Sequence, residues 1–106
     1  MKQPIAVVYR GLAPQPLLEA DLRRWHEKLQ RCGIQPIDCR VTVESPSARH
    51  QHNGCEVRIE LRLPGDDLVI SEHHHGEEAR PVVRRAFIAL NRQLRERVKR
   101  WRELRA

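Results

Sequence analysis

Two segments of the chain alternate strictly between apolar and polar residues, and this pattern constrains the fold more than any other feature. They run from Ile37 to Glu44 (IDCRVTVE) and from Cys55 to Leu63 (CEVRIELRL). Successive side chains of a β-strand point to opposite faces, so a period of two predicts strands with one covered and one solvated face. The residues predicted to point inward are Ile37, Cys39, Val41, Val43, Cys55, Val57, Ile59, Leu61 and Leu63.

An amphipathic helix is predicted from about Gln15 to Cys32. Apolar residues recur there at spacings of three and four, which places them on one side of a helix. Pro16 suits the first helical turn, and Gly33 stands where a C-terminal cap belongs. The apolar stripe consists of Leu18, Leu22, Trp25, Leu29 and Cys32.

A second helix is predicted to begin after the segment HHHGEEA and to continue to the end of the sequence. Glu77 and Glu78 near its start oppose the positive end of the helix dipole, and Pro81 fits the first turn. Its apolar stripe consists of Val83, Phe87, Leu90, Leu94, Val98 and Trp101.

Two shorter runs complete the predicted sheet. Ile5 to Arg10 is a β-branched run that ends at a glycine, and Leu68 to Ser71 follows a Pro-Gly turn. The second run should pair with Glu56 to Leu63 as an antiparallel hairpin. The order β-α-β-β-β-α predicts an α+β fold, a four-stranded sheet with two helices packed on one face. We expect 106 residues to form a single domain, 1–106.

Positive charge is concentrated at the end of the chain. The net charge is +6, yet residues 80–106 hold ten Lys or Arg and only two Glu. Five basic residues share one side of the last helix, apart from its apolar stripe, and the first helix adds four more. Guanidinium groups match phosphate oxygens in pairs, so such a surface can follow a folded RNA backbone without reading its sequence. The predicted RNA-binding residues are Arg23, Arg24, Lys28, Arg31, Arg85, Arg92, Arg95, Lys99 and Arg102.

The same basic helix permits other interpretations. It could be a solvated face with ion pairs such as Arg92 to Glu96, or it could bind an acidic protein partner. A membrane-surface helix would need an apolar face left free for lipid, whereas the apolar stripe is needed to cover the sheet. No membrane partner is therefore expected.

Aromatic residues make up only 4% of the chain. Trp25 and Trp101 lie on the apolar helical stripes, which favours packing in the core over stacking on bases. RNA binding by bases stacked on an open sheet is accordingly not expected. The sequence predicts contact through phosphates and shape.

Neither a metal site nor an active site is predicted. Three consecutive histidines, His73 to His75, would point to alternate sides of a strand, and His50, His52 and Cys55 do not have a zinc-finger spacing. All these histidines are interpreted as polar loop residues that add positive charge near RNA at slightly acidic pH. Asp66 and Asp67 are best explained as turn formers. We expect no enzyme activity, no cofactor and no small-molecule substrate.

Cysteine usage and the short apolar runs favour a cytoplasmic protein. Cys32, Cys39 and Cys55 form an odd set without a C-x-x-C spacing, so reduced, buried thiols are expected. The apolar runs are too short to span a bilayer, and no secretory leader is expected at the start of the chain.

Three stretches together carry a resemblance that spans nearly the whole chain: LEADLRRWHEKLQR, VRIELRLPGDDLVISE and AFIALNRQLRERVKR. With the element order, they resemble the ribosome hibernation promoting factor family, also called sigma-54 modulation or ribosome-associated inhibitor proteins. The resemblance implies the same β-α-β-β-β-α fold. It also implies binding to the small ribosomal subunit, in the channel used by messenger and transfer RNA, and non-enzymatic silencing of translation under stress.

The chain departs from this family where HHHGEEARP replaces a short acidic segment with an aromatic residue. An alternative is a general structured-RNA-binding protein resembling the double-stranded RNA-binding domain, whose α-β-β-β-α order is contained in this one. That fold lacks the opening strand Ile5 to Arg10.

Overall fold

The computed structural model describes residues 5–29, 31, 36–45, 54–64 and 69–105. Its elements are β1 (Ile5–Arg10), α1 (Pro16–Leu29), β2 (Asp38–Glu44), β3 (Cys55–Arg62), β4 (Val69–Gly76) and α2 (Ala79–Arg105). This is the predicted β-α-β-β-β-α order. Cys32, Gly33, His50, His52, Asp66, Asp67 and Leu68, on which parts of the sequence analysis rest, lie outside the described residues.

The four strands form one sheet in the order β1-β2-β3-β4. β1 is parallel to β2, and the other two pairs are antiparallel. The β3–β4 pair is the predicted hairpin, with Leu61 opposite Ile70. Gly11, which follows β1, has a φ of 73°, a conformation that glycine adopts without a steric penalty.

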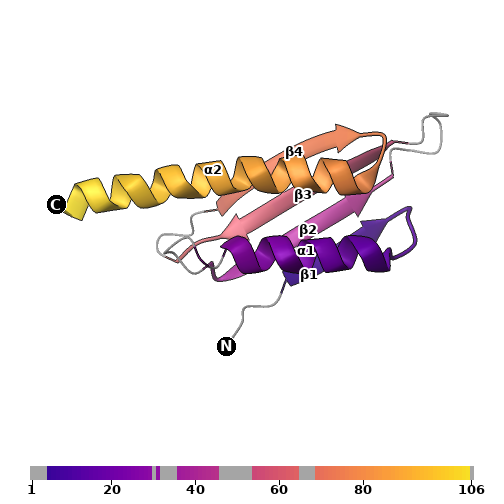
Figure 1. Cartoon of the computed structure of the whole chain (residues 1–106), viewed down its shortest axis with the longest axis horizontal. Helices are drawn as coiled ribbons and strands as arrows, with labels where there is room; N and C mark the ends of the chain where they lie inside the picture. The colour runs from indigo at the N-terminus through magenta and orange to yellow at the C-terminus, as the bar shows by residue number, and fades with distance from the viewer. Residues whose placement is uncertain (1–4, 30, 32–35, 46–53, 65–68, 106) are drawn as a thin grey trace.

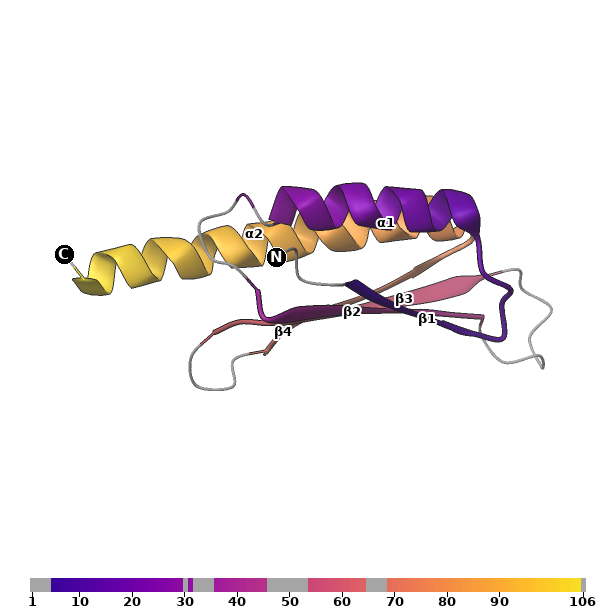
Figure 2. The same ribbon diagram turned by 90° about the horizontal axis from the view of Figure 1, so that it is seen from below.

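Both helices lie on the same face of the sheet (Figure 1), and the second view shows the helices and the sheet as two layers (Figure 2). α2 packs mainly over β3 and β4, whereas α1 contacts β1 and lies beside α2. The two helices run in the same direction, and the C-terminal part of α2 projects past the end of the sheet (Figure 1).

The core lies between the two layers, as the two periodicities predict. Every predicted inward residue of β3 is buried, together with Leu63 just after it. Four α2 stripe residues, from Val83 to Leu94, are also buried, while Val98 and Trp101 are partly buried against the core. Each fully buried large aliphatic side chain contributes about 1.5–3 kcal/mol, so this stripe fixes α2 to the sheet.

Three predicted details are wrong. Ile37 is 43% exposed because it precedes β2 and donates its N–H to the carbonyl oxygen of Arg62 (2.7 Å) instead of continuing the inward row. α1 ends at Leu29, short of the predicted Cys32. β4 continues to Gly76, well beyond Ser71, because its ladder with β3 extends to the pair Cys55–Gly76.

The longer β4 brings its last residue against α2. A Cβ atom at Gly76 would lie 2.7 Å from a methyl group of Val82 and 2.8 Å from a nitrogen of Arg85. The closeness of β4 to the start of α2 therefore favours glycine at this position, since a larger residue would have to displace the Val82 and Arg85 side chains.

Candidate nucleic-acid interface

Four of the five basic residues predicted on α2 stand on its solvent side. Arg92, Arg95, Lys99 and Arg102 are exposed, while the apolar stripe of the same helix faces the sheet. Counted over its whole length, α2 has ten Lys or Arg against two Glu. The prediction that these side chains lie apart from the core is confirmed.

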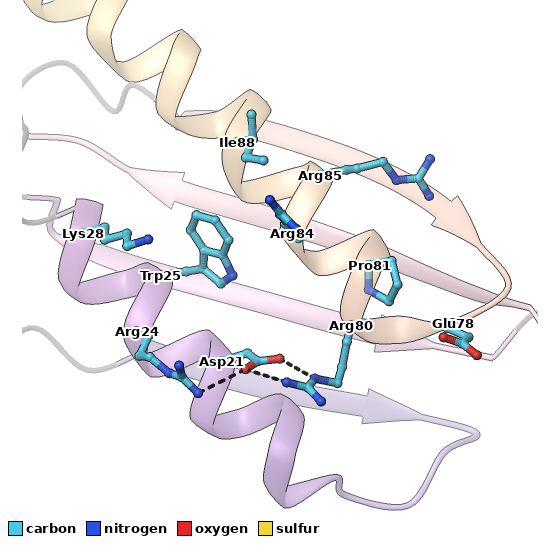
Figure 3. Close-up of a pocket in the computed structure, with 10 residues that line it drawn as sticks. All are labelled: Asp21, Arg24, Trp25, Lys28, Glu78, Arg80, Pro81, Arg84, Arg85 and Ile88. Carbon is cyan, nitrogen blue, oxygen red and sulfur yellow. Dashed lines mark hydrogen bonds and ion pairs between the residues drawn. The ribbon is translucent and has the colours of Figure 1, made fainter.

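Arg85 is exposed too, but it points elsewhere. Its Nη2 donates a hydrogen bond to the backbone oxygen of His75 at 3.0 Å. The side chain extends over β4, away from α1 (Figure 3). Arg85 thus ties the start of α2 to the end of β4, although it also contributes to the lining of the groove between α1 and α2.

α1 contributes exposed cations but no net charge. Arg23, Arg24 and Lys28 are exposed, and Arg31 is exposed in the turn after the helix. Three acids on α1, Glu19, Asp21 and Glu27, balance its three cations. The positive field of the helical layer therefore comes mainly from α2.

A groove runs between the two helices (Figure 3). α1 lines it with Asp21, Arg24, Trp25 and Lys28, and α2 lines it with residues that include Arg80, Arg84 and Ile88. Arg80 and Arg84 are absent from the predicted set, which followed a different row of basic residues along α2. Their position on the α2 edge next to α1 was not visible in the sequence, since a helical stripe does not reveal which of its two edges meets the neighbouring helix.

Asp21 joins the two helices at one end of this groove. It accepts two hydrogen bonds from the Arg80 guanidinium, from Nε at 2.6 Å and from Nη2 at 3.2 Å. Arg24 approaches the same carboxylate at 3.6 Å. The hydrogen bond from Arg80 lowers the pKa of Asp21, aided by the charges of Arg80 and Arg24 and opposed by desolvation.

The middle of the groove contains an aromatic pair. The Trp25 ring is parallel to the Phe87 ring within 9°, with 6.0 Å between centroids. The Lys28 Nζ atom lies 4.6 Å from the centre of the Trp25 ring, a cation–π contact. Phe87 is buried and Trp25 is only partly buried, so Trp25 extends the core to the surface of the groove.

The opposite face of the sheet is also charged, but its signs alternate. Arg10, Arg40, Arg58 and Arg62 share this face with Asp38, Glu44, Glu56 and Glu60. Opposite charges meet across strands, as in the pair Arg40 and Glu60. Without its histidines, this face carries no net charge.

The three consecutive histidines belong to β4 rather than to a loop, so that part of the prediction is wrong. As expected for a strand, they alternate: His73 approaches Glu56 of the outer face at 3.6 Å, whereas His74 contacts Glu72 at 2.7 Å. Gln93 of α2 donates hydrogen bonds to Glu72 and to the backbone oxygen of Ser71. Among the residues that the structure describes, no group of three or more His, Cys, Asp or Glu could hold a metal ion.

Other ionisable groups lie in the core. Cys39 and Cys55 are free and buried, as predicted, and burial raises the pKa of the Cys39 thiol to about 12. His26 of α1 is buried, and desolvation lowers its pKa. Its Nε2 atom has no hydrogen-bond partner among the described residues.

The family described as sigma 54 modulation protein / S30EA ribosomal protein matches residues 5–102. A comparison with curated protein sequences gives no match. In the described part of the chain, no helix is long and apolar enough to cross a membrane.

Two solved structures are similar to the whole fold. The N-terminal domain of Protein Y from Thermus thermophilus is 14% identical with a TM-score of 0.72, and the match covers 91% of this chain and 98% of that one. A ribosomal subunit interface protein from Coxiella burnetii is 16% identical with a TM-score of 0.74, covering 90% of this chain and 97% of that one. At these identities the likeness establishes the fold alone.

Proposed function

Because the chain belongs to the sigma 54 modulation protein / S30EA ribosomal protein family, we propose that it is a ribosome-associated protein that binds ribosomal RNA of the small subunit. The Coxiella burnetii protein of similar fold is described as a ribosomal subunit interface protein. The observation that carries the proposal is the excess of positive charge on α2, which has ten cations and two acids. Its apolar stripe is already packed against the sheet.

RNA contact through α2 would depend on phosphates rather than on sequence. Exposed arginines along about 40 Å of helix can bind successive phosphates of a folded RNA. The predicted residues on α1 would add contacts at the side of α2, although α1 has no net charge of its own. Affinity should therefore fall steeply as the salt concentration rises.

The proposed mechanism is occupancy. The molecule measures 53 × 26 × 22 Å, and residues 1–106 would act as one ribosome-binding domain that fills the path of messenger and transfer RNA. Silencing of translation would follow from steric exclusion in the cytoplasm, without a chemical step or a cofactor. The two described thiols are buried with raised pKa values, which disfavours a role for them as nucleophiles.

The experiment is co-sedimentation with separated small and large ribosomal subunits at low and physiological salt. We expect saturable binding to the small subunit and loss of that binding in the triple variant Arg92→Glu, Arg95→Glu, Lys99→Glu. These side chains are exposed, so the variant should keep its circular dichroism spectrum. Undiminished binding by the folded triple variant would falsify the proposal.

The alternative is a general binder of structured RNA. Adding free duplex RNA to the same assay separates the two. Duplex RNA that displaces the protein as well as an equal mass of small subunits would favour the general binder, whereas weak competition would favour ribosome binding.

A further inference from the structure

The groove between α1 and α2 combines an aromatic wall with a cationic rim. Trp25 and Ile88, which is 43% exposed, form its apolar part. Five Lys or Arg side chains and two acids belong to the same lining. Figure 3 shows the Trp25 indole standing between the helices, with Lys28 on one side and Arg84 on the other.

The cations along the groove differ in whether an acid already binds them. At one end, Arg80 and Arg24 are already engaged with Asp21. One turn farther along α2 and beside Trp25 (Figure 3), Arg84 is exposed and has no ion-pair partner within the described part of the chain. A ligand that enters beside Trp25 therefore meets an aromatic ring and a guanidinium whose charge is not compensated by a described acid.

We propose that this groove holds one unpaired nucleotide of an RNA, with its base stacked on Trp25 and its phosphate bound by Arg84 and Lys28. The proposal rests on the RNA-binding function proposed above and names the part of the RNA that the groove takes. A base in a duplex is already stacked on its neighbours, so only an unpaired one can enter.

Lys28 is the side chain that must move. It covers the Trp25 ring at 4.6 Å, and it is exposed on the last full turn of α1. A base has a flat face that matches the indole, and stacking on an aromatic ring is worth more than an exposed cation–π contact. The displaced ammonium remains at the rim, where a phosphate would replace the ring as its partner.

The buried side of the site is already rigid. Phe87 is 1% exposed and holds its ring parallel to Trp25, so a bound base would extend an existing stack. Trp25 would lose little rotational freedom on binding, since the core already fixes its side chain. An acidic peptide could meet the same cations, but aspartate and glutamate side chains have no aromatic ring to stack on the indole.

The test uses the Trp101→Phe background, which leaves Trp25 as the only tryptophan of the chain. Two RNA hairpins with stems of equal length, each closed by a non-nucleotide linker so that neither has an unpaired loop base, are titrated while tryptophan emission is recorded. One hairpin is fully paired and the other carries a single unpaired adenine. We expect the unpaired adenine to quench Trp25 and to raise the affinity by about 10-fold over the paired hairpin. Equal affinities, or unchanged emission at saturation, would overturn the proposal.

A matched pair of variants separates the groove from the general charge. Ile88 and Ile37 are both 43% exposed, and only Ile88 lines the groove. Ile88→Glu should abolish the preference for the unpaired adenine, while Ile37→Glu should preserve it. Trp25→Leu should also abolish the preference and leave the affinity for the paired hairpin unchanged. Equal effects of the two glutamate variants would contradict the assigned site.

Further measurements distinguish RNA from other ligands of the groove, and they separate the nucleotide site from the proposed binding to the small ribosomal subunit. Adenosine monophosphate that quenches Trp25 at the concentrations effective for RNA would show a free-nucleotide site and overturn the RNA assignment. A polyglutamate peptide that competes with the hairpin for Trp25 would do the same in favour of a protein partner. Small-subunit binding without any effect on Trp25 would overturn only the nucleotide site, whereas the absence of all RNA and ribosome binding would overturn both proposals.

Discussion

The two faces of this molecule are both lined with arginines, and they differ in what surrounds those arginines. On the outer face of the sheet, arginines and acids are interspersed, as in the cross-strand pair of Arg40 and Glu60. α2 contains ten cations and only two acids. Segregated charges produce a long-range field, whereas alternating charges cancel within a few ångströms. The number of arginines therefore says less about function than their arrangement.

α2 presents its cations at a fixed place only while it is packed on the sheet, and Phe87→Ala would weaken that packing. Phe87 is 1% exposed, and the substitution should lower the free energy of unfolding by about 3–5 kcal/mol. Urea denaturation followed by circular dichroism measures the change. Phe87→Leu, which keeps a large apolar side chain, should cost less than half as much; equal losses would mean that the ring is not a principal contact of the helix.

The contrast between the faces is measured directly by removing three positive charges from each. Neutralising Arg92, Arg95 and Lys99 to glutamine should lower RNA affinity by roughly 100-fold at low salt and reduce the slope of log affinity against log salt by about two to three. Fluorescence anisotropy with a labelled structured RNA gives both quantities.

The matched control carries the same charge change on the sheet. Arg10→Gln, Arg40→Gln, Arg58→Gln removes three exposed cations from the outer face. Its affinity should stay within a few-fold of the wild type, and its salt slope should be unchanged. A loss as large as that of the α2 variant would mean that net charge alone, not its arrangement, governs binding.

Between the two faces, His26 makes stability depend on pH. Burial lowers its folded-state pKa below the ordinary value of about 6.5, so the unfolded chain takes up a proton first as the pH falls. This group should therefore reduce stability from about pH 6.5 downward, by at most about 1.4 kcal/mol per pH unit. In His26→Leu the decline over this range should be shallower than in the wild type; identical slopes in urea denaturation at pH 5 to 7 would refute the assignment.

The smallest expected effect concerns Asp21, an acid within the otherwise positive helical layer. Asp21→Asn removes the partner of Arg80 and should cause only the small loss of stability usual for an exposed ion pair. The pKa of Asp21 is lowered in the folded state, so its contribution is present above about pH 4 and disappears as the pH falls further.

The same substitution should act on binding in the opposite direction. It adds one net positive charge beside the groove, so RNA affinity should rise roughly two- to three-fold at low salt. Thermal melts and anisotropy on the same sample measure both effects. A variant that lost both stability and RNA affinity would show that Asp21 positions the cations of the groove instead of reducing their net positive charge.

The alternating strands and the helical stripes were sufficient to predict the secondary structure and most of the core. Cys55 to Leu63 alternates as predicted because the hydrophobic pattern fixes which face of a strand is covered. The extension of β4 through His73 to His75 was not predictable from pattern, since histidines have no strong strand signal. Pairing with β3 determines their conformation, and Glu72 and Glu56 provide their partners.

The candidate interface was predicted only in part. The sequence identified α2 as the carrier of positive charge, because charge is counted along the chain. It did not reveal that α1 would meet the Arg84 edge of α2 or that Arg85 would turn toward His75. The sequence also did not distinguish Trp25, which reaches the surface of the groove, from a residue buried in the core.

The sequence by itself determined the element order, the covered face of the sheet and the concentration of positive charge in the last helix. These features follow from local periodicity and composition, which need no knowledge of distant contacts. Only the tertiary structure decided which side chains share the groove between α1 and α2. That depends on the packing of two helices that are distant in sequence, as the contact between Asp21 and Arg80, 59 residues apart, illustrates. Packing of this kind is set by the whole core rather than by either helix.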